Sequence, residues 1–180
     1  RIVDDLLDLS LIETQEAPPR APVPLEVLVD DAVDQLRPAA AAAGINLQVH
    51  PGVAGALVSC DRRQVVSALA NLIDNAVKYS EQGSPVTVST ALAGDMVEVC
   101  VRDAGIGIPS RDLERIFERF YRVDQARSRD TGGTGLGLSI VKHVLNLHDS
   151  DLRIDSELGK GSTFSCEFPA SRLLGRGMGE

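Results

Sequence analysis

The sequence predicts an α+β fold, a two-layer sandwich in which about three helices pack on a mixed, largely antiparallel sheet. Segments with helical periodicity are interspersed with segments that alternate in period two, and the regular strand–helix alternation of a doubly wound fold is missing. The 180-residue chain, with 43% apolar residues, is long enough to bury one core. Its 3% aromatic content, with no tryptophan, predicts an aliphatic core.

Charge and cysteine content exclude several classes of function. The formal net charge of −8 argues against a nucleic-acid binder or a membrane-surface protein, because both usually need a basic face. An anionic small ligand remains compatible with a local cluster of Lys and Arg. Cys60, Cys100 and Cys166 are odd in number and widely spaced, which disfavours a disulfide framework or a zinc site. Their expected role is packing.

The N-terminal third of the chain predicts helix, linker and helix. Residues 1–16 include apolar side chains at near-heptad spacing, which is typical of the end of a longer helix. Prolines break this helix, and residues 17–24 are predicted to be a linker. The next helix is expected at 25–43, with Gly44 as its stop.

The central part predicts strands around a long amphipathic helix. This helix is expected at 61–80, with Asp61 as its N-cap and apolar residues on one face. Period-two alternation predicts strands at 45–50, more weakly at 57–59, and at 85–92 and 96–103, the last two forming a hairpin.

The C-terminal part predicts further helices, one long loop and a second strand pair. A helix is expected at 110–120 with Ser110 as its N-cap. Residues 122–134 lack periodicity and are expected to form a mobile loop. The remaining expected elements are a helix at 135–148, strands at 151–157 and 162–168, and a loose tail at 171–180.

A glycine-rich loop precedes the helix at 135–148. Residues 131–142 read TGGTGLGLSIVK, which fits neither the P-loop pattern nor GxGxxG, since position 138 is leucine. What remains is a glycine loop that enters a helix N-terminus, where unpaired N–H groups favour an anion. Taken alone, a flexible hinge is an equally good interpretation.

Two other stretches carry polar groups where a ligand could bind. In DAGIGI (103–108), Asp103 ends a strand and two glycines open the following turn, so the carboxylate could accept a hydrogen bond from an exocyclic amine. In NLIDNAVKYS (71–80), Asn71, Asn75 and Lys78 lie on or near one helical face. Amide oxygens can bind Mg²⁺ and Lys can neutralise phosphate. A tight turn with an Asx cap, and a solvated polar helix face, are the plain alternatives.

Together these motifs resemble a known family. NLIDNAVKYS, DAGIGI, FERFYR, GGTGLGLSIVK and GKGSTF occur in the order of the N box, first glycine box, F box, second glycine box and third glycine box of bacterial sensor histidine kinases. The resemblance is to their ATP-binding catalytic domain, in the GHKL group of ATPases, and covers roughly residues 25–168. It implies an ATP-binding catalytic domain at 25–170, with a mobile ATP lid.

The resemblance implies roles for the residues of the N box and for Asp103. Asn75 would coordinate Mg²⁺, and Asn71 would lie near the phosphates. Lys78 and Tyr79 would contact phosphate or ribose. Asp103 would hold the adenine amine.

The other implied residues surround the nucleotide. Phe117 and Phe120 would anchor the lid, and Arg122 would reach the γ-phosphate. Asn71, Lys78 and Arg122 form the implied catalytic set. Positions in and beside the glycine boxes would complete the binding site, namely Gly105, Ile106, Gly107, Ile108, Gly133, Gly135, Leu136, Gly137, Leu138, Gly161 and Thr163.

The implied reaction is transfer of the ATP γ-phosphate to a histidine. In relatives that hydrolyse ATP, such as DNA gyrase B subunits, a glutamate four residues before the metal-binding Asn activates water. Asn71 occupies that position here, and an amide cannot act as a general base. An ATPase cycle is therefore disfavoured. An anti-sigma-type kinase or a scaffold that only binds partners fits less well, because the F box and the heptad-like N-terminus favour a histidine kinase.

The implied partners are a dimerisation hairpin, which carries the phosphate-accepting histidine, and a response regulator, without nucleic acid. Residues 1–16 resemble the end of the hairpin's second helix. His50, His143 and His148 are not followed by Glu, and none lies in an acceptor motif, so the segment is expected to be inactive alone. The full-length protein is expected to be a membrane-anchored homodimer with this domain in the cytoplasm. Whether the segment itself is a monomer stays open. HDSD (148–151) departs from the family's His-glycine pattern.

Overall fold

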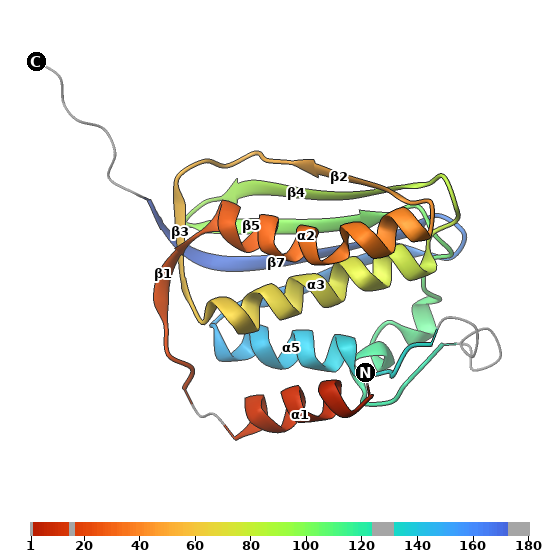
Figure 1. Ribbon diagram of the computed structural model, residues 1–180, viewed down its shortest axis with the longest axis horizontal. Helices are drawn as coiled ribbons and strands as arrows, with labels where there is room; N and C mark the ends of the chain where they lie inside the picture. Colours follow the sequence, from red (N-terminus) through yellow and green to blue (C-terminus); the bar gives the residue numbers. More distant parts are fainter. Residues whose placement is uncertain (1, 15–16, 124–131, 173–180) are drawn as a thin grey trace, which may run out of the picture.

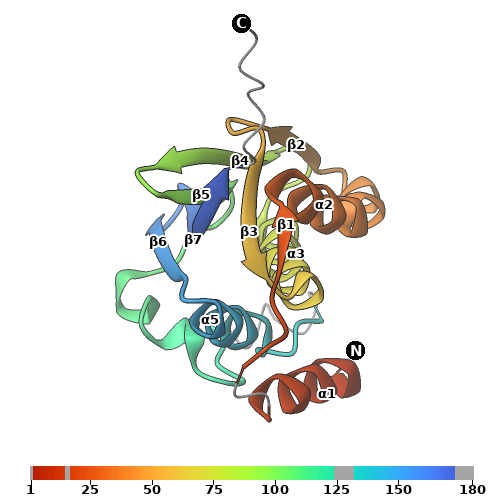
Figure 2. The same cartoon turned by 90° about the vertical axis from the view of Figure 1, so that its left-hand side faces the viewer.

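The computed structural model describes residues 2–14, 17–123 and 132–172. Within these ranges, seven strands form one sheet, and the helices α2, α3 and α5 cover one of its faces (Figures 1 and 2). The helix α1 lies outside this layer, beside α5 (Figure 2). The predicted α+β sandwich with a mixed, largely antiparallel sheet is confirmed.

The four α-helices of the described residues lie where the apolar periodicity predicts them, with boundaries that differ by one to three residues. They are α1 (Ile2–Glu13), α2 (Leu25–Ala42), α3 (Arg62–Tyr79) and α5 (Gly137–Leu147). The predicted cap of α3 is confirmed, because the Asp61 carboxylate accepts a hydrogen bond of 3.2 Å from the N–H of Gln64. This bond satisfies one of the donors that a helix N-terminus leaves unpaired.

The sheet has the strand order β1-β3-β7-β5-β4-β2. The remaining strand, β6, pairs with the first part of β7 on the edge opposite β5. Only the β2–β4 pair is parallel among the described strands. The last strand, β7, pairs with β5 and β6 along most of its length and with β3 at its end. The strands are β1 (Ala21–Pro24), β2 (Asn46–His50), β3 (Ala56–Cys60), β4 (Pro85–Ala93), β5 (Met96–Asp103), β6 (Asp151–Glu157) and β7 (Gly161–Arg172).

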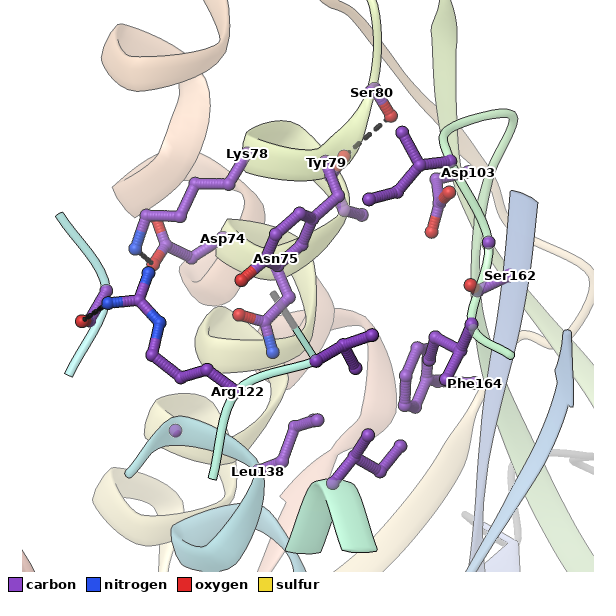
Figure 3. A pocket seen from close by; sticks show the side chains of 18 of the residues that line it. Asp74, Asn75, Lys78, Tyr79, Ser80, Asp103, Arg122, Leu138, Ser162 and Phe164 are labelled. Atoms are coloured by element: carbon purple, nitrogen blue, oxygen red, sulfur yellow. Dashed lines mark hydrogen bonds and ion pairs between the residues drawn. The ribbon is translucent and has the colours of Figure 1, made fainter. Parts of the chain in front are cut away.

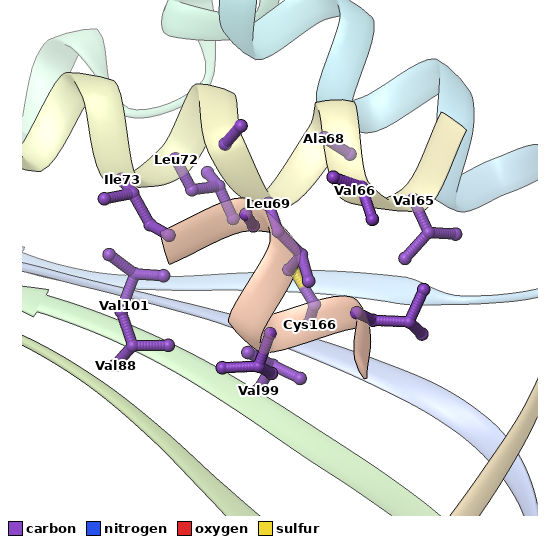
Figure 4. Packing of buried hydrophobic residues seen from close by; sticks show 14 of the residues in the cluster. Val65, Val66, Ala68, Leu69, Leu72, Ile73, Val88, Val99, Val101 and Cys166 are labelled. Atoms are coloured by element: carbon purple, nitrogen blue, oxygen red, sulfur yellow. The ribbon is translucent and has the colours of Figure 1, made fainter. Parts of the chain in front are cut away.

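The core lies between the sheet and the helices and is aliphatic, as the composition predicts. Leu69 and Ile73 project from α3 toward Val99 and Val101 of β5 (Figure 4). All four side chains are at most 1% exposed. Cys166 is fully buried in the same cluster, so it has the expected packing role. Because α3 is held by this layer, its opposite side is free to carry polar residues.

The predicted helix at 110–120 is wrong. Two short 3₁₀ helices form instead, η1 (Ser110–Asp112) and η2 (Arg115–Phe117), and Pro109, not Ser110, precedes the first. Glu118 has extended backbone angles and Phe120 has a φ of 63°. The chain turns here because the N–H of Phe120 donates to the carbonyl of Gly135, a contact between distant residues that local propensity does not encode.

The linker and tail boundaries also need correction. Residues 21–24 of the predicted linker form β1, an edge strand on β3 that tolerates two prolines because one side of it pairs with nothing in the described sheet. β7 continues to Arg172, two residues into the predicted tail, and there pairs with β3. Most of the predicted mobile loop at 122–134 lies outside the described residues.

The part of the chain that the structure describes contains no helix long and apolar enough to cross a bilayer. The described cysteines are unpaired, and Cys60 and Cys166 are buried.

Candidate functional site

A pocket of about 800 Å³ opens at one end of the sheet. Its walls are the second half of α3, the end of β5 with the loop that follows it, the segments on either side of residues 124–131, and the first turn of α5. Figure 3 shows Asp103 on one side of this pocket and Lys78 with Arg122 on the other. The polar residues predicted from three separate motifs therefore converge on one cavity.

The predicted N-box residues share one wall. Asn71, Asn75, Lys78 and Tyr79 all line the pocket from α3. The ring of Tyr79 and the amide of Asn75 project between the two sides in Figure 3. Their spacing along α3 produces this arrangement, because residues three and four apart share a helix face.

The carboxylate of Asp103 lies at the end of β5 and is 7% exposed. It accepts a hydrogen bond of 2.9 Å from the N–H of Gly105 and another from the backbone N–H of Ser162. Burial nevertheless raises its pKa, because desolvation outweighs these two bonds. A buried carboxylate in a ligand-sized pocket is suited to accept a hydrogen bond from a bound amine.

Glycines of the predicted first glycine box stand where backbones approach closely. A Cβ at Gly105 would lie 2.1 Å from the carbonyl oxygen of Tyr79, and one at Gly107 would lie 2.0 Å from that of Glu157. Between them, the N–H of Ile106 donates to the carbonyl of Tyr79. The loop is thus fastened to the end of α3, and Ile106, 41% exposed, faces the opening.

The third glycine box supports Asp103 from behind. Gly161 has a φ of 101°, and a Cβ there would lie 2.1 Å from the carbonyl oxygen of Asp103. Asp103 pairs with Ser162 across β5 and β7. These contacts locate the buried carboxylate at the back of the pocket. They also explain why position 161 is a glycine, because a side chain there would collide with the Asp103 backbone.

The second glycine box forms the wall nearest the segment 124–131. Arg122 donates a hydrogen bond of 2.6 Å to the carbonyl of Gly133. Gly135, at a φ of 73°, accepts the N–H of Phe120 at 2.9 Å. These two bonds join the segment before residues 124–131 to the segment after them. Arg122, Gly133 and Gly135 all line the pocket.

The first turn of α5 faces the same cavity. Gly137 and Leu138 line it. A Cβ at Gly137 would lie 3.2 Å from the side-chain oxygen of Asn71, so glycine lets this turn approach α3. No side chain caps α5 at Leu136. The first N–H groups of a helix have no partner within it, and this end of α5 can therefore attract an anion.

Six predicted residues do not line the cavity themselves, and one of them is Gly161, which lies against the backbone of Asp103. Leu136 is fully buried, and Phe120 is 61% exposed. Phe117 is partly buried, with the Lys142 ammonium 5.1 Å from its ring. The other two are Gly105 and Thr163. Gly105 lies against the backbone of Tyr79, and Thr163, on β7, pairs with Arg102 of β5 and Asp155 of β6.

Several residues that line the pocket are not among the site residues predicted from the sequence. Asp74 forms an ion pair with Lys78, and its spacing of four residues is a signal that could have revealed it. Ser162 and Phe164 line the pocket from β7, where they alternate on one face of the strand that pairs with β5 beside Asp103. Ser80, Tyr121 and Thr134 also line the pocket and lie within the quoted motifs. Lining residues outside every motif are Glu81, Pro109, Arg111, Ile116, Val123 and Leu158.

The two sides of the pocket suit the two ends of a nucleotide. Around Asp103 lie apolar residues, including Ile106, Ile108 and Phe164, which can contact a flat base. Lys78, Arg122 and the first turn of α5 supply positive charge at the other side. An adenine base with a phosphate chain matches this division.

Comparison with known proteins agrees with the fold and the pocket. Residues 60–172 match the family HATPase_c, described as "Histidine kinase-, DNA gyrase B-, and HSP90-like ATPase". The chain belongs to this family. The match starts at the residue before the α3 cap, ends with β7 and includes the four walls of the pocket.

Similar proteins place the chain more narrowly, as the ATP-binding catalytic domain of a two-component sensor histidine kinase. The sensor-like histidine kinase SenX3 of Mycobacterium tuberculosis is 43% identical over 170 residues, 94% of this chain and 41% of that protein. The chain thus spans less than half of this relative.

Solved structures show the same architecture. The mycobacterial sensor histidine kinase MprB has a TM-score of 0.74 at 28% identity, over 86% of this chain and 99% of that one. Full-length ShkA, solved in complex with AMPPNP, has a TM-score of 0.81 at 28% identity, over 96% of this chain and 36% of that one.

Proposed function

We propose that this domain binds Mg·ATP in the pocket and transfers the γ-phosphate to a histidine on the dimerisation hairpin of the full-length protein. An aspartate of a response regulator then takes the phosphate. The observation that carries the proposal is the division of one pocket between a buried carboxylate, Asp103, and a cationic side formed by Lys78 and Arg122. The volume of the pocket, about 800 Å³, lies in the range of pockets that bind small ligands.

The base and the phosphates receive separate roles in this proposal. Asp103 accepts the adenine amine, while Ile106, Gly107 and Ile108 line the base. The phosphates lie against Lys78, Arg122 and the first turn of α5. Gly133, Gly135 and Gly137 let the backbone approach them. Because phosphoryl transfer depends mainly on positioning and charge stabilisation, these groups are sufficient to organise it.

Asn75 is the proposed Mg²⁺ ligand. Its amide lies in the pocket wall, and an amide oxygen is a hard ligand of the kind that Mg²⁺ accepts. The described residues contain no group of three or more His, Cys, Asp or Glu that could hold a metal ion. A single amide ligand such as Asn75 fits Mg²⁺, which usually binds one or two protein ligands together with substrate phosphates and water. When bound, Mg²⁺ neutralises charge on the phosphates.

Transfer to water is disfavoured by the groups near the phosphates. Asn71 is an amide and cannot accept a proton near neutral pH. Asp74, a carboxylate in the same pocket, is engaged by the Lys78 ammonium at 2.5 Å. Hydrolysis by the isolated domain should therefore be slower than about one turnover per minute, far below the roughly 10 per second of a typical enzyme.

The hairpin contact belongs to the same proposal. The helix α1 corresponds to the end of the hairpin's second helix, since Leu9 packs into the domain while Val3, Leu6 and Leu7 stay exposed. Glu13 of α1 forms an ion pair with Arg119, in the F box. A full-length homodimer anchored in the plasma membrane, with this domain on its cytoplasmic side, completes the proposal.

A two-part experiment tests the function. Calorimetry with ATP, with and without Mg²⁺, measures binding to the isolated domain. The domain is then mixed with a separately produced dimerisation hairpin and radiolabelled ATP, and acid-labile label on the hairpin histidine is the expected product. Normal ATP binding with no label on the hairpin at any concentration would contradict the transfer step. Failure of ATP to bind would contradict the whole proposal.

A further inference from the structure

The phosphate side of the pocket contains its own anion. On α3, Nζ of Lys78 lies 2.5 Å from a carboxylate oxygen of Asp74. Both side chains are 17% exposed, and both residues line the pocket (Figure 3). This is the least exposed of the ion pairs measured among the described residues. The cation assigned to phosphate therefore already has a carboxylate partner from its own helix.

The arrangement should hold Lys78 firmly. An acid four residues before a Lys is the favourable order on a helix, and the cation lies in the last turn of α3, where the helix dipole also favours it. Partial burial strengthens such a pair because water screens it less. Asp74 thus fixes the direction in which the ammonium points.

The same contact opposes phosphate binding. An ammonium has three N–H donors, but its charge is largely neutralised when a carboxylate lies at 2.5 Å. A phosphate that approaches Lys78 must share this cation with Asp74 and is repelled by the carboxylate. The base side of the pocket, around Asp103, does not depend on Lys78.

We propose that Asp74 is a positioning residue that competes with the nucleotide's phosphates for Lys78 and so weakens the affinity for phosphorylated nucleotides. The inference rests on the proposed function, since it requires that the phosphates lie beside Lys78. Its consequence is selective: Asp74 lowers the affinity for ATP and ADP and leaves the affinity for adenosine unchanged. A weaker hold on the phosphates also speeds nucleotide release.

The test is Asp74→Asn, which keeps the shape and an acceptor oxygen but removes the charge. Calorimetry with ATP, ADP and adenosine should show about tenfold tighter binding of ATP and ADP, because the Lys78 ammonium is released from Asp74 and can donate a charge-assisted hydrogen bond to a phosphate. Adenosine binding should change less than about twofold. Asp74→Ala, which leaves no acceptor, should give the same selectivity and serves if the first variant folds poorly.

Two comparisons separate this role from a general charge effect. Asp34→Asn removes the partner of Arg37 on the exposed surface of α2, outside the pocket lining, and should leave all three affinities unchanged. In a Lys78→Gln background, Asp74→Asn should tighten ATP binding less than about twofold, because the contested ammonium is gone.

Each outcome decides between the two proposals. If wild-type protein binds neither ATP nor adenosine, the proposed function is wrong. If it binds both and Asp74→Asn leaves ATP affinity unchanged or weaker, the role of Asp74 is wrong while the function stands. An equal gain in the Lys78→Gln background, or with Asp34→Asn, would also overturn competition for Lys78.

Discussion

Asp103 is a buried pocket carboxylate whose surroundings oppose its charged form. Its pKa is raised by burial, despite N–H donors from Gly105 and Ser162. A carboxyl whose folded pKa lies above its unfolded value stabilises the fold at low pH and loses that contribution as pH rises through the folded pKa. In its ionised form Asp103 therefore costs stability, and a ligand that donates a hydrogen bond to the carboxylate would offset that cost.

Replacement of Asp103 by Asn should separate stability from binding. The free energy of unfolding at pH 7 should rise, because the amide can still accept from Gly105 without a buried charge. Adenine nucleotide affinity should fall by about 10- to 150-fold, because a hydrogen bond involving a charged group is lost. Denaturant titration and calorimetry measure the two effects. Normal ATP affinity would show that the adenine position is wrong.

His148 is a second buried residue with a defined protonation state. Its Nε2 accepts the N–H of Asp61 at 3.0 Å, so the neutral ring carries its proton on Nδ1, which lies 2.7 Å from the carbonyl of Val144. Burial lowers its pKa. Protonation would set an N–H donor against the N–H of Asp61, the cap of α3.

Acid should therefore destabilise the domain through His148. The neutral ring stabilises the fold fully above the unfolded pKa of about 6.5, and this contribution is lost as pH falls through the lower folded pKa. Denaturant titrations from pH 7.5 to pH 5 should show falling stability, with a shallower fall in His148→Asn. An identical pH dependence in both proteins would rule out this residue as the cause.

At the scale of elements, the turn between β6 and β7 offers a matched test of close packing. Gly159 and Gly161 both have positive φ, at 83° and 101°, but a Cβ at Gly159 meets nothing within 4 Å. Gly159→Ala should cost about 1 kcal/mol of backbone strain and leave nucleotide affinity unchanged. Gly161→Ala should cost more than twice as much, because its Cβ strikes the Asp103 carbonyl, and should weaken ATP binding. Equal effects would contradict this account of the pocket's rear wall.

The elements also show what the sequence could predict. α3 follows from its amphipathic pattern and its Asp61 cap, which are local signals. The segment 110–120 has a similar apolar spacing, yet Phe120 turns to meet Gly135, and a contact between residues so far apart leaves no trace in local periodicity. The edge strand β1 carries two prolines, which predict a linker because proline disfavours a strand anywhere except at an edge.

The candidate site was predictable where its residues lie in local motifs, and not where they reach the pocket through contacts between distant segments. Residues in short motifs, such as Asn75 and Asp103, line the pocket where predicted. Residues that reach it through tertiary packing, such as Ile116 and Val123, belong to no motif. Asp74 lay within a motif, but its role depends on the direction of the Lys78 side chain, which spacing alone leaves undecided.

At the scale of the whole molecule, the last strand is central to the sheet. β7 pairs with β3, β5 and β6, and without it β3 and β5 become open edges. A chain that ends at Lys160 should therefore lose the cooperative unfolding transition and expose apolar surface to a hydrophobic dye. A chain shortened only by residues 173–180 should unfold like the full sequence. Cooperative unfolding of the shorter chain would contradict the importance of this strand.

The position of β7 has a consequence for biosynthesis. A nascent chain that has reached residue 160 holds two pieces of sheet, β1–β3 and β2–β4–β5, with nothing to bridge them. Each piece presents unpaired backbone groups until β7 leaves the ribosome, so the domain should complete its fold only after residue 172 has emerged. A stop codon at the start of the β7 coding segment should thus eliminate the domain instead of trimming it.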